Sequence, residues 1–278
     1  MERQEINNFW KFCLLREQVR INKESGQAQP WTQDPILQRH KFTNINRKHD
    51  RGTRLLDALC QDLTPYRKFC ASAIYRFSGS NNGLITMMQD NKPLYWFDLL
   101  GSVTPLFNMS AYQANWPNGK DSGRNFMLRT LSVFCNATFH QFKNNMGIIE
   151  ARDIMCDMLN LHGLKRMRFQ TTEIAKDLSM MTDLVDPDSE CPMNVGAVKG
   201  LKYIFNTTST RNLVNLVNSD QNPGYNTQVL EHALCEYSKY RDYQTGVRKA
   251  HQKVYKPHES AYNNNKVIIN QTEEANND

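Results

Sequence analysis

The 278-residue sequence lacks the short motifs that mark several large classes of enzyme. It contains no G-x-x-x-x-G-K-[ST], because Gly119-Lys120 is followed by Asp121. It also contains no G-x-G-x-x-G, no H-E-x-x-H and no G-x-S-x-G. These absences argue against a P-loop kinase, a dinucleotide-binding enzyme, a zinc metalloprotease and an α/β-hydrolase.

Metal sites and membrane segments also lack support in the sequence. The seven cysteines form no C-x-x-C pair, and no two histidines have the spacing of zinc ligands. We therefore expect reduced core thiols, no metal and no other cofactor. The acids between residues 183 and 190 do not fit an EF-hand and predict a solvated loop. No run approaches 18 apolar residues, and no apolar leader follows Met1, so we expect no membrane association.

The composition is typical of a globular protein, and the positive charge is unevenly distributed along the sequence. Hydrophobic residues make up 40% and charged residues 22%, which is enough apolar material for a core. The net charge is +6, and the segment from Arg39 to Arg54 has six basic residues and one acid, a local charge of +5. Such a segment can bind phosphates, or it can pair with acids on the protein surface.

Apolar residues recur at helical spacing through most of the chain, and this predicts an all-α fold. The run 93–99 could form one short strand, and residues 102–124 are expected to be irregular. We expect one helical domain over residues 1–255 and a disordered polar tail over 256–278. Three predicted helices follow from their caps: one begins at Pro35 after an Asp34 N-cap, one is capped by Thr53, and one covers residues 227–240 after an Asn226 N-cap. The other predicted helices cover residues 6–24, 65–78, 126–142, 148–159 and 169–180.

The basic segment gives the first candidate binding site. If residues 47–54 are helical, Arg47, Asp50, Arg51 and Arg54 share one face. Guanidinium groups on one face can bind a phosphate bidentately, and Asp50 would hold them in place. A surface helix stabilised by salt bridges is the alternative.

Two later segments give weaker candidates. Gly196 and Gly200, with Lys199 between them, predict a tight turn whose amides could approach a phosphate, although an ordinary loop-to-helix junction has the same pattern. In the helix expected after Asn226, His232, Glu236 and Lys239 form a polar stripe beside the apolar face. Glu236 and Lys239 could also simply pair with each other.

Taken together, these segments resemble a helical family found in phage thymidine-hypermodification systems. Its members include the amino acid:DNA transferases, formerly called α-glutamyl/putrescinyl thymine pyrophosphorylases, and the helical domain of 5-hydroxymethyluracil DNA kinases. The resemblance spans roughly residues 6–245. The matching positions are Arg16 and Arg20 in the first helix, Trp31 and Asp34 in Pro-Trp-Thr-x-Asp-Pro-Ile-Leu, Asn44, Arg47, Asp50 and Arg51 in Lys-Phe-x-Asn-x-x-Arg-x-x-Asp-Arg, Gly196 and Gly200 in Gly-x-x-x-Gly-Leu, and Glu236 and Lys239 in the late Leu-Cys-Glu-aromatic-x-Lys-aromatic helix.

The chain departs from the family pattern at two places. Residues 196–200 read Gly-Ala-Val-Lys-Gly where a Gly-Pro-Gly element with arginine is expected, and Ser238 stands in place of an aspartate. The resemblance also implies a helix-hairpin-helix, DNA-glycosylase-like fold. Gly163 would lie in the hairpin and Asp177 in the helix that follows.

The resemblance implies a transferase that replaces the phosphate or pyrophosphate on 5-phosphomethyl-uracil in double-stranded DNA with the amine of a free amino acid. Such a modification protects viral DNA from restriction. The base would be flipped out of the duplex and stacked on Trp31 or Phe42, and a carboxylate would deprotonate the amine. The candidate bases are Asp50, Asp177 and Glu236, and the candidate substrate and phosphate ligands are Arg20, Trp31, Asp34, Asn44, Arg47, Arg51, Gly196, Lys199, Gly200 and Lys239.

Two other functions fit the same residues. A DNA glycosylase would also flip the base but would release it, and a non-catalytic reader would only bind modified thymine. We expect a monomer that works in the host cytoplasm if phage-encoded, or in the nucleus if eukaryotic.

Overall fold

The computed structural model describes residues 2–78, 116, 123, 125–164 and 167–248, and within them it is built from helices. No strand is formed in these ranges; Met146 and Val185 form an isolated parallel bridge, and His40 is also a bridge residue. The all-α prediction is therefore confirmed for this part of the chain. The expected strand at 93–99, most of the irregular stretch 102–124 and the tail 256–278 lie outside the described residues. The elements are α1 (Glu2–Glu24), α2 (Pro35–Arg39), η1 (Arg47–His49), α3 (Arg51–Cys60), α4 (Pro65–Ser78), the π-helical η2 (Phe126–Thr130), α8 (Leu131–Phe139), α9 (Ile148–Leu161), α10 (Arg168–Met181), α11 (Val195–Phe205), η3 (Thr210–Asn212), α12 (Leu213–Val217) and α13 (Thr227–Gln244).

Several helix ends lie where the sequence places them. The Asp34 side chain accepts hydrogen bonds from the backbone N–H groups of Ile36 and Leu37, and Pro35 occupies the first turn of α2. Asn226 caps α13 in the same way, through the N–H of Val229. Local side-chain chemistry thus determines where these two helices begin.

Residues 47–54 do not form one helix, so the condition for a shared charged face is not met, and Thr53 is not the cap of the helix that follows. Arg47–His49 form a separate 3-10 turn, and Asp50 has extended backbone angles, φ −73° and ψ 134°. α3 begins only at Arg51, so Asp50 and not Thr53 occupies its N-cap position. As a result, the four charged residues at 47, 50, 51 and 54 do not share a helix face.

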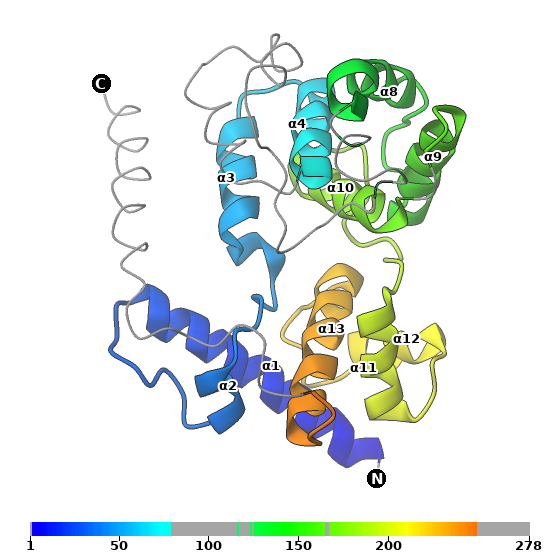
Figure 1. Cartoon of the computed structure of the whole chain (residues 1–278). Helices are drawn as coiled ribbons and strands as arrows, with labels where there is room; N and C mark the ends of the chain where they lie inside the picture. Colours follow the sequence, from blue (N-terminus) through cyan, green and yellow to red (C-terminus); the bar gives the residue numbers. More distant parts are fainter. Residues whose placement is uncertain (1, 79–115, 117–122, 124, 165–166, 249–278) are drawn as a thin grey trace.

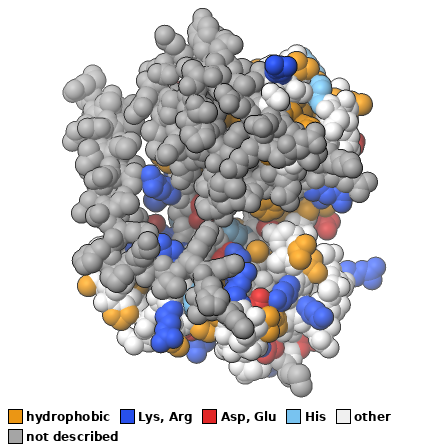
Figure 2. All heavy atoms as spheres, in the orientation of Figure 1, with side chains coloured by type: hydrophobic (Ala, Val, Ile, Leu, Met, Phe, Trp, Pro, Cys, Tyr) orange, Lys and Arg blue, Asp and Glu red, His pale blue; other side chains and the backbone are white. Residues whose placement is uncertain are grey.

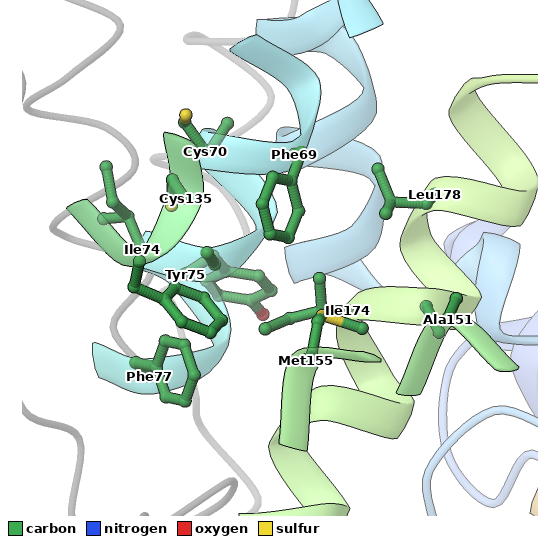
Figure 3. Close-up of a cluster of buried hydrophobic side chains, with 14 of the residues drawn as sticks. Phe69, Cys70, Ile74, Tyr75, Phe77, Cys135, Ala151, Met155, Ile174 and Leu178 are labelled. Atoms are coloured by element: carbon green, nitrogen blue, oxygen red, sulfur yellow. The ribbon is translucent and has the colours of Figure 1, made fainter. Parts of the chain in front are cut away.

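The described helices form two groups, each around its own hydrophobic cluster (Figure 1). The upper group contains α3, α4, α8, α9 and α10. Its core includes Phe69 of α4, Met155 of α9 and Ile174 of α10, which lie near one another, and Ile74 of α4, which lies beside Cys135 of α8 (Figure 3). The lower group contains α1, α2, α11, α12 and α13, and its core joins residues near the N-terminus to those of α13.

In the lower cluster, aromatic side chains of α1 pack against α13. The ring of Phe9 lies edge-on to Tyr237 with centroids 5.4 Å apart, and Phe12 lies 5.0 Å from Tyr240. Aromatic pairs in these orientations stabilise a core beyond their buried area. The first described helix is therefore held in place by α13, the last described one.

The cysteines behave as expected for core thiols. All seven are free; six are buried, and Cys235 is half-buried. Burial raises the pKa of Cys60 and of Cys191 to about 12, which keeps both thiols protonated and unreactive. In the ranges given above, no three His, Cys, Asp or Glu side chains gather as a metal-binding group, and none of the helices is long and apolar enough to cross a bilayer.

Candidate active site

A network of buried charges joins the two groups of helices. Arg47, in the segment that connects α2 to α3, reaches α10, where its guanidinium binds Glu173 and lies 3.2 Å from the carboxylate of Asp177. Only 7% of Arg47 is exposed. Basic and acidic side chains are visible near the middle of the face drawn in Figure 2. A segment that the sequence places on the surface thus supplies a cation to the protein interior.

Asp177 lies at the centre of this network and is fully buried. It accepts hydrogen bonds from the Ser72 hydroxyl at 2.6 Å and from Nε and Nη2 of Arg76 at 2.7 Å each, in addition to Arg47. These four donors match the roughly four acceptor sites of a carboxylate. Asp177 therefore fixes two guanidinium groups, and this argues against its predicted role as the catalytic base.

Glu173 and Lys176 extend the network from α10 to α13. Lys176 Nζ lies 2.6 Å from Glu231 and 3.3 Å from Glu173. Burial alone would raise the pKa of the Glu173 carboxyl, but Arg47 and Lys176 outweigh burial and lower that pKa from 4.5 to about 2. Burial lowers the pKa of Lys176, but Glu231 and Glu173 reverse the effect and leave it raised. Both groups are therefore ionised at neutral pH.

The segment that carries Arg47 is held from two sides. Arg16 of α1 donates hydrogen bonds to the carbonyl oxygens of Phe42 and Thr43 and to the Asn44 side chain, at 2.7–3.0 Å. From α13, a carboxylate oxygen of Glu236 accepts the backbone N–H of Thr43 at 3.1 Å. Buried hydrogen bonds to charged groups are among the strongest in proteins, so the path of this segment is well defined.

Thr43 also forms the exposed edge of the network. Its hydroxyl lies 2.8 Å from Nε2 of His232 in α13, and Thr43 itself is solvent-exposed. One turn further along α13, Glu236 is 2% exposed and pairs with Lys239. Burial raises the pKa of Glu236, but Lys239 and His232 outweigh burial, so the pKa of this carboxyl is lowered. Here the half-buried side chains of His232 and Lys239 flank the buried carboxylate of Glu236 at the edge of the network.

The predicted phosphate-binding glycine turn is wrong. Gly196 and Gly200 lie inside α11 and face α13. A Cβ atom on Gly196 would lie 2.5 Å from Cys235 Sγ, and one on Gly200 would overlap the carbonyl oxygen of Leu234. The two glycines therefore allow close packing of two helices. Between them, Lys199 pairs with Asp242 of α13 at 2.6 Å.

Several other predicted residues lie outside this network. Arg20 pairs with Glu17 and Glu24 of its own helix, and Asp34 caps α2 while accepting the Tyr240 hydroxyl at 2.7 Å. Half-buried Trp31 donates its Nε1–H to the carbonyl oxygen of Gln27. These contacts give Arg20 and Asp34 structural roles.

Phe42 cannot stack on an extruded base, as the sequence suggested, because it is buried. Its ring lies 5.9 Å from Phe12 and 6.3 Å from Tyr240. A base could reach it only by displacing these aromatic side chains. Trp31 is the remaining candidate from the sequence.

Asp50 and Arg51 lie between the connecting segment and α3. A carboxylate oxygen of Asp50 accepts the N–H of Asn44 at 3.4 Å, and Asn44 in turn donates to the carbonyl oxygen of His49 at 2.8 Å. Arg51 is the first residue of α3 and its side chain is exposed. Arg39 and Arg54 of the basic segment are exposed as well, so three guanidinium groups of this segment lie at the surface while Arg47 is buried.

Five members of the network were not predicted: Ser72, Arg76, Glu173, Lys176 and Glu231. One signal was available, because Ser72 and Arg76, like Glu173 and Asp177, are four residues apart among apolar residues of predicted helices. Such pairs share a helix face and must be paired when that face is buried.

One part of the chain matches a known protein family. Residues 3–64 match the family model described as "5-hmdU DNA kinase, helical domain". No curated protein and no solved structure matches the chain. The matched range contains Arg16, Thr43 and Arg47, which supply one side of the network. Residues 3–64 are therefore similar to the helical domain of 5-hmdU DNA kinases, which are DNA-modifying enzymes.

Proposed function

We propose that the chain is a transferase that replaces the phosphate of 5-phosphomethyl-uracil in DNA with the amine of an amino acid. The observation that carries this proposal is that the matched segment and two later helices converge. Arg47 contacts Glu173 and Asp177 of α10, and the N–H of Thr43 contacts Glu236 of α13. Displacement of a phosphate by an amine requires cations and a proton acceptor in one place, and this region supplies both.

The residues divide into positioning and contacting groups. Arg47 is buried and bound to two carboxylates, so it positions α10 relative to the connecting segment. Exposed Arg51, at the N-terminus of α3, and half-buried Lys239, beside Glu236, are the candidate cations for a leaving phosphate. The helix N-terminus adds partial positive charge next to Arg51. Half-buried Trp31 is the candidate for stacking on a flipped base, an interaction of about 1–3 kcal/mol.

The function is tested by incubating the chain with duplex DNA that contains 5-phosphomethyl-uracil and a mixture of amino acids. The DNA is then digested, and its nucleosides are analysed by mass spectrometry. We expect a thymidine derivative that carries one amino acid in place of the phosphate. An abasic site would instead show a glycosylase, and bound but unchanged DNA would show a reader; either result would overturn the proposal.

A pair of variants tests the role of Arg51. Arg51→Ala removes the exposed cation beside α3 and is expected to lower transfer at least tenfold, because charge-assisted contacts to phosphate are lost. Arg211→Ala, at an exposed arginine in η3, is the matched control and should leave transfer unchanged. Equal rates for the two variants would exclude Arg51 from phosphate binding.

A further inference from the structure

We infer that His232 is the general base that takes the proton from the incoming amine. This inference rests on the proposed transferase function. His232 lies in α13, half-buried, with Nε2 2.8 Å from the Thr43 hydroxyl at an exposed contact. It is thus a titratable side chain at the solvent edge of the buried network. Histidine is the residue whose ordinary pKa best suits proton exchange near neutral pH.

The buried carboxylates are poorly suited to this role. Asp177 is fully buried and receives hydrogen bonds from three side chains. The pKa of the Glu173 carboxyl is lowered to about 2, and the carboxylate is paired with Arg47 and Lys176. Glu236 is 2% exposed and accepts from Thr43 and Lys239. The lowered pKa values of Glu173 and Glu236 make them weak proton acceptors, and four donors already occupy the carboxylate of Asp177.

Two of these carboxylates interact with His232. Glu173 and Glu236 both interact with it electrostatically, one from α10 and one from its own helix. The charged groups that act on these two carboxylates besides His232 are Arg47, Arg76, Lys176 and Lys239.

Thr43 acts as a positioning residue for His232. Its backbone is fixed by Arg16 and Glu236, so its hydroxyl holds the imidazole at a defined place. Because Thr43 lies within the matched residues 3–64, the helical domain would orient a base that a later helix supplies.

The proton balance of the step is complete with His232 as a shuttle. His232 removes one proton from the ammonium group of the amino acid. The free amine attacks the exocyclic methylene carbon of the base, the C–N bond forms, and the C–O bond to phosphate breaks. The departing phosphate takes the proton from His232 and leaves as hydrogen phosphate, and the product amine remains a secondary ammonium.

The test compares His232→Gln and His232→Asn with wild type, using the amino acid that wild type transfers. Loss of a general base is expected to lower the rate of transfer about 100-fold or more, without weakening DNA binding. In wild type, the rate should rise with pH as the general base loses its proton, and then level off. Both variants should lose that rise, and added imidazole should restore part of the rate.

Controls separate this role from a structural one. His140→Gln, at an exposed histidine after α8, should behave as wild type. Thr43→Val should lower the rate less than His232→Gln does and keep the pH-dependent rise. Asp50→Asn tests the half-exposed carboxylate as the rival base.

The outcomes distinguish the two proposals. If wild type transfers an amino acid and both His232 variants retain its rate and pH profile, the inference about His232 fails alone. It also fails if Asp50→Asn, and not His232→Gln, abolishes the rise with pH. If wild type transfers none of the amino acids, the proposed function and this inference fall together.

Discussion

Glu173→Gln removes one negative charge from the buried network while keeping the shape of the side chain. In the folded protein, Arg47 and Lys176 lower the pKa of Glu173 from 4.5 to about 2, against the effect of burial. This difference corresponds to roughly 3 kcal/mol of stability at neutral pH. Removing one partner of a buried ion pair costs about 3–5 kcal/mol, which agrees with that value. We expect the variant to be less stable at pH 7 by about this amount.

The pH dependence gives a sharper test than the value at pH 7. Because the pKa of Glu173 is lower in the folded state, its contribution is fully present above about pH 4.5 and is lost as the pH falls toward 2. At pH 3, roughly 2 kcal/mol of it should be gone. The difference between wild type and Glu173→Gln should therefore shrink steadily between pH 5 and pH 3.

Urea denaturation at pH 7, 5, 4 and 3 measures this difference through the free energy of unfolding. Glu190→Gln is the matched control, because Glu190 is exposed, and its curve should follow wild type at every pH. A constant difference between wild type and Glu173→Gln across this range would refute the reasoning. So would a difference below about 1 kcal/mol at pH 7, the value typical of surface ion pairs.

Three further predictions concern packing, capping and thiols. Gly200→Ala should destabilise the protein by about 1–3 kcal/mol, because its Cβ would overlap Leu234, while Gly147→Ala, whose nearest neighbour is 3.8 Å away, should change stability little in urea denaturation. Asp34→Ala should cost about 2 kcal/mol in the same assay, because it removes the α2 cap and the acceptor of Tyr240. In the native protein, a thiol reagent should label half-buried Cys235 first, as read by peptide mass spectrometry.

The helices could be predicted from the sequence because their signals are local. A capping Asp34, a first-turn Pro65 and apolar spacing over 148–159 each act within a few residues, and the structure confirms the elements that they indicate. The aromatic contacts between α1 and α13 could not be predicted in this way, because they join residues more than 220 positions apart.

The site was only partly predictable for the same reason. The basic character of residues 39–54 favoured phosphate binding, but only tertiary structure shows that Arg47 is buried while Arg51 is exposed. Glycine spacing is equally ambiguous, since Gly196 and Gly200 could serve a turn or a close helix contact. The structure shows the close helix contact, because a Cβ atom at either glycine would overlap atoms of α13.

The matched residues 3–64 do not contain all of the contacts that define their own structure. Phe9 packs on Tyr237, the N–H of Thr43 is bound by Glu236, and Arg47 is bound by Asp177. Near the end of the match, Leu56 belongs to the upper hydrophobic cluster, with side chains of α4 and α10. The segment from Phe42 to Arg47 therefore owes its geometry to α10 and α13 as much as to α1. Any chemistry that depends on this segment must belong to both groups of helices together, since neither group alone fixes the positions of Thr43 and Arg47.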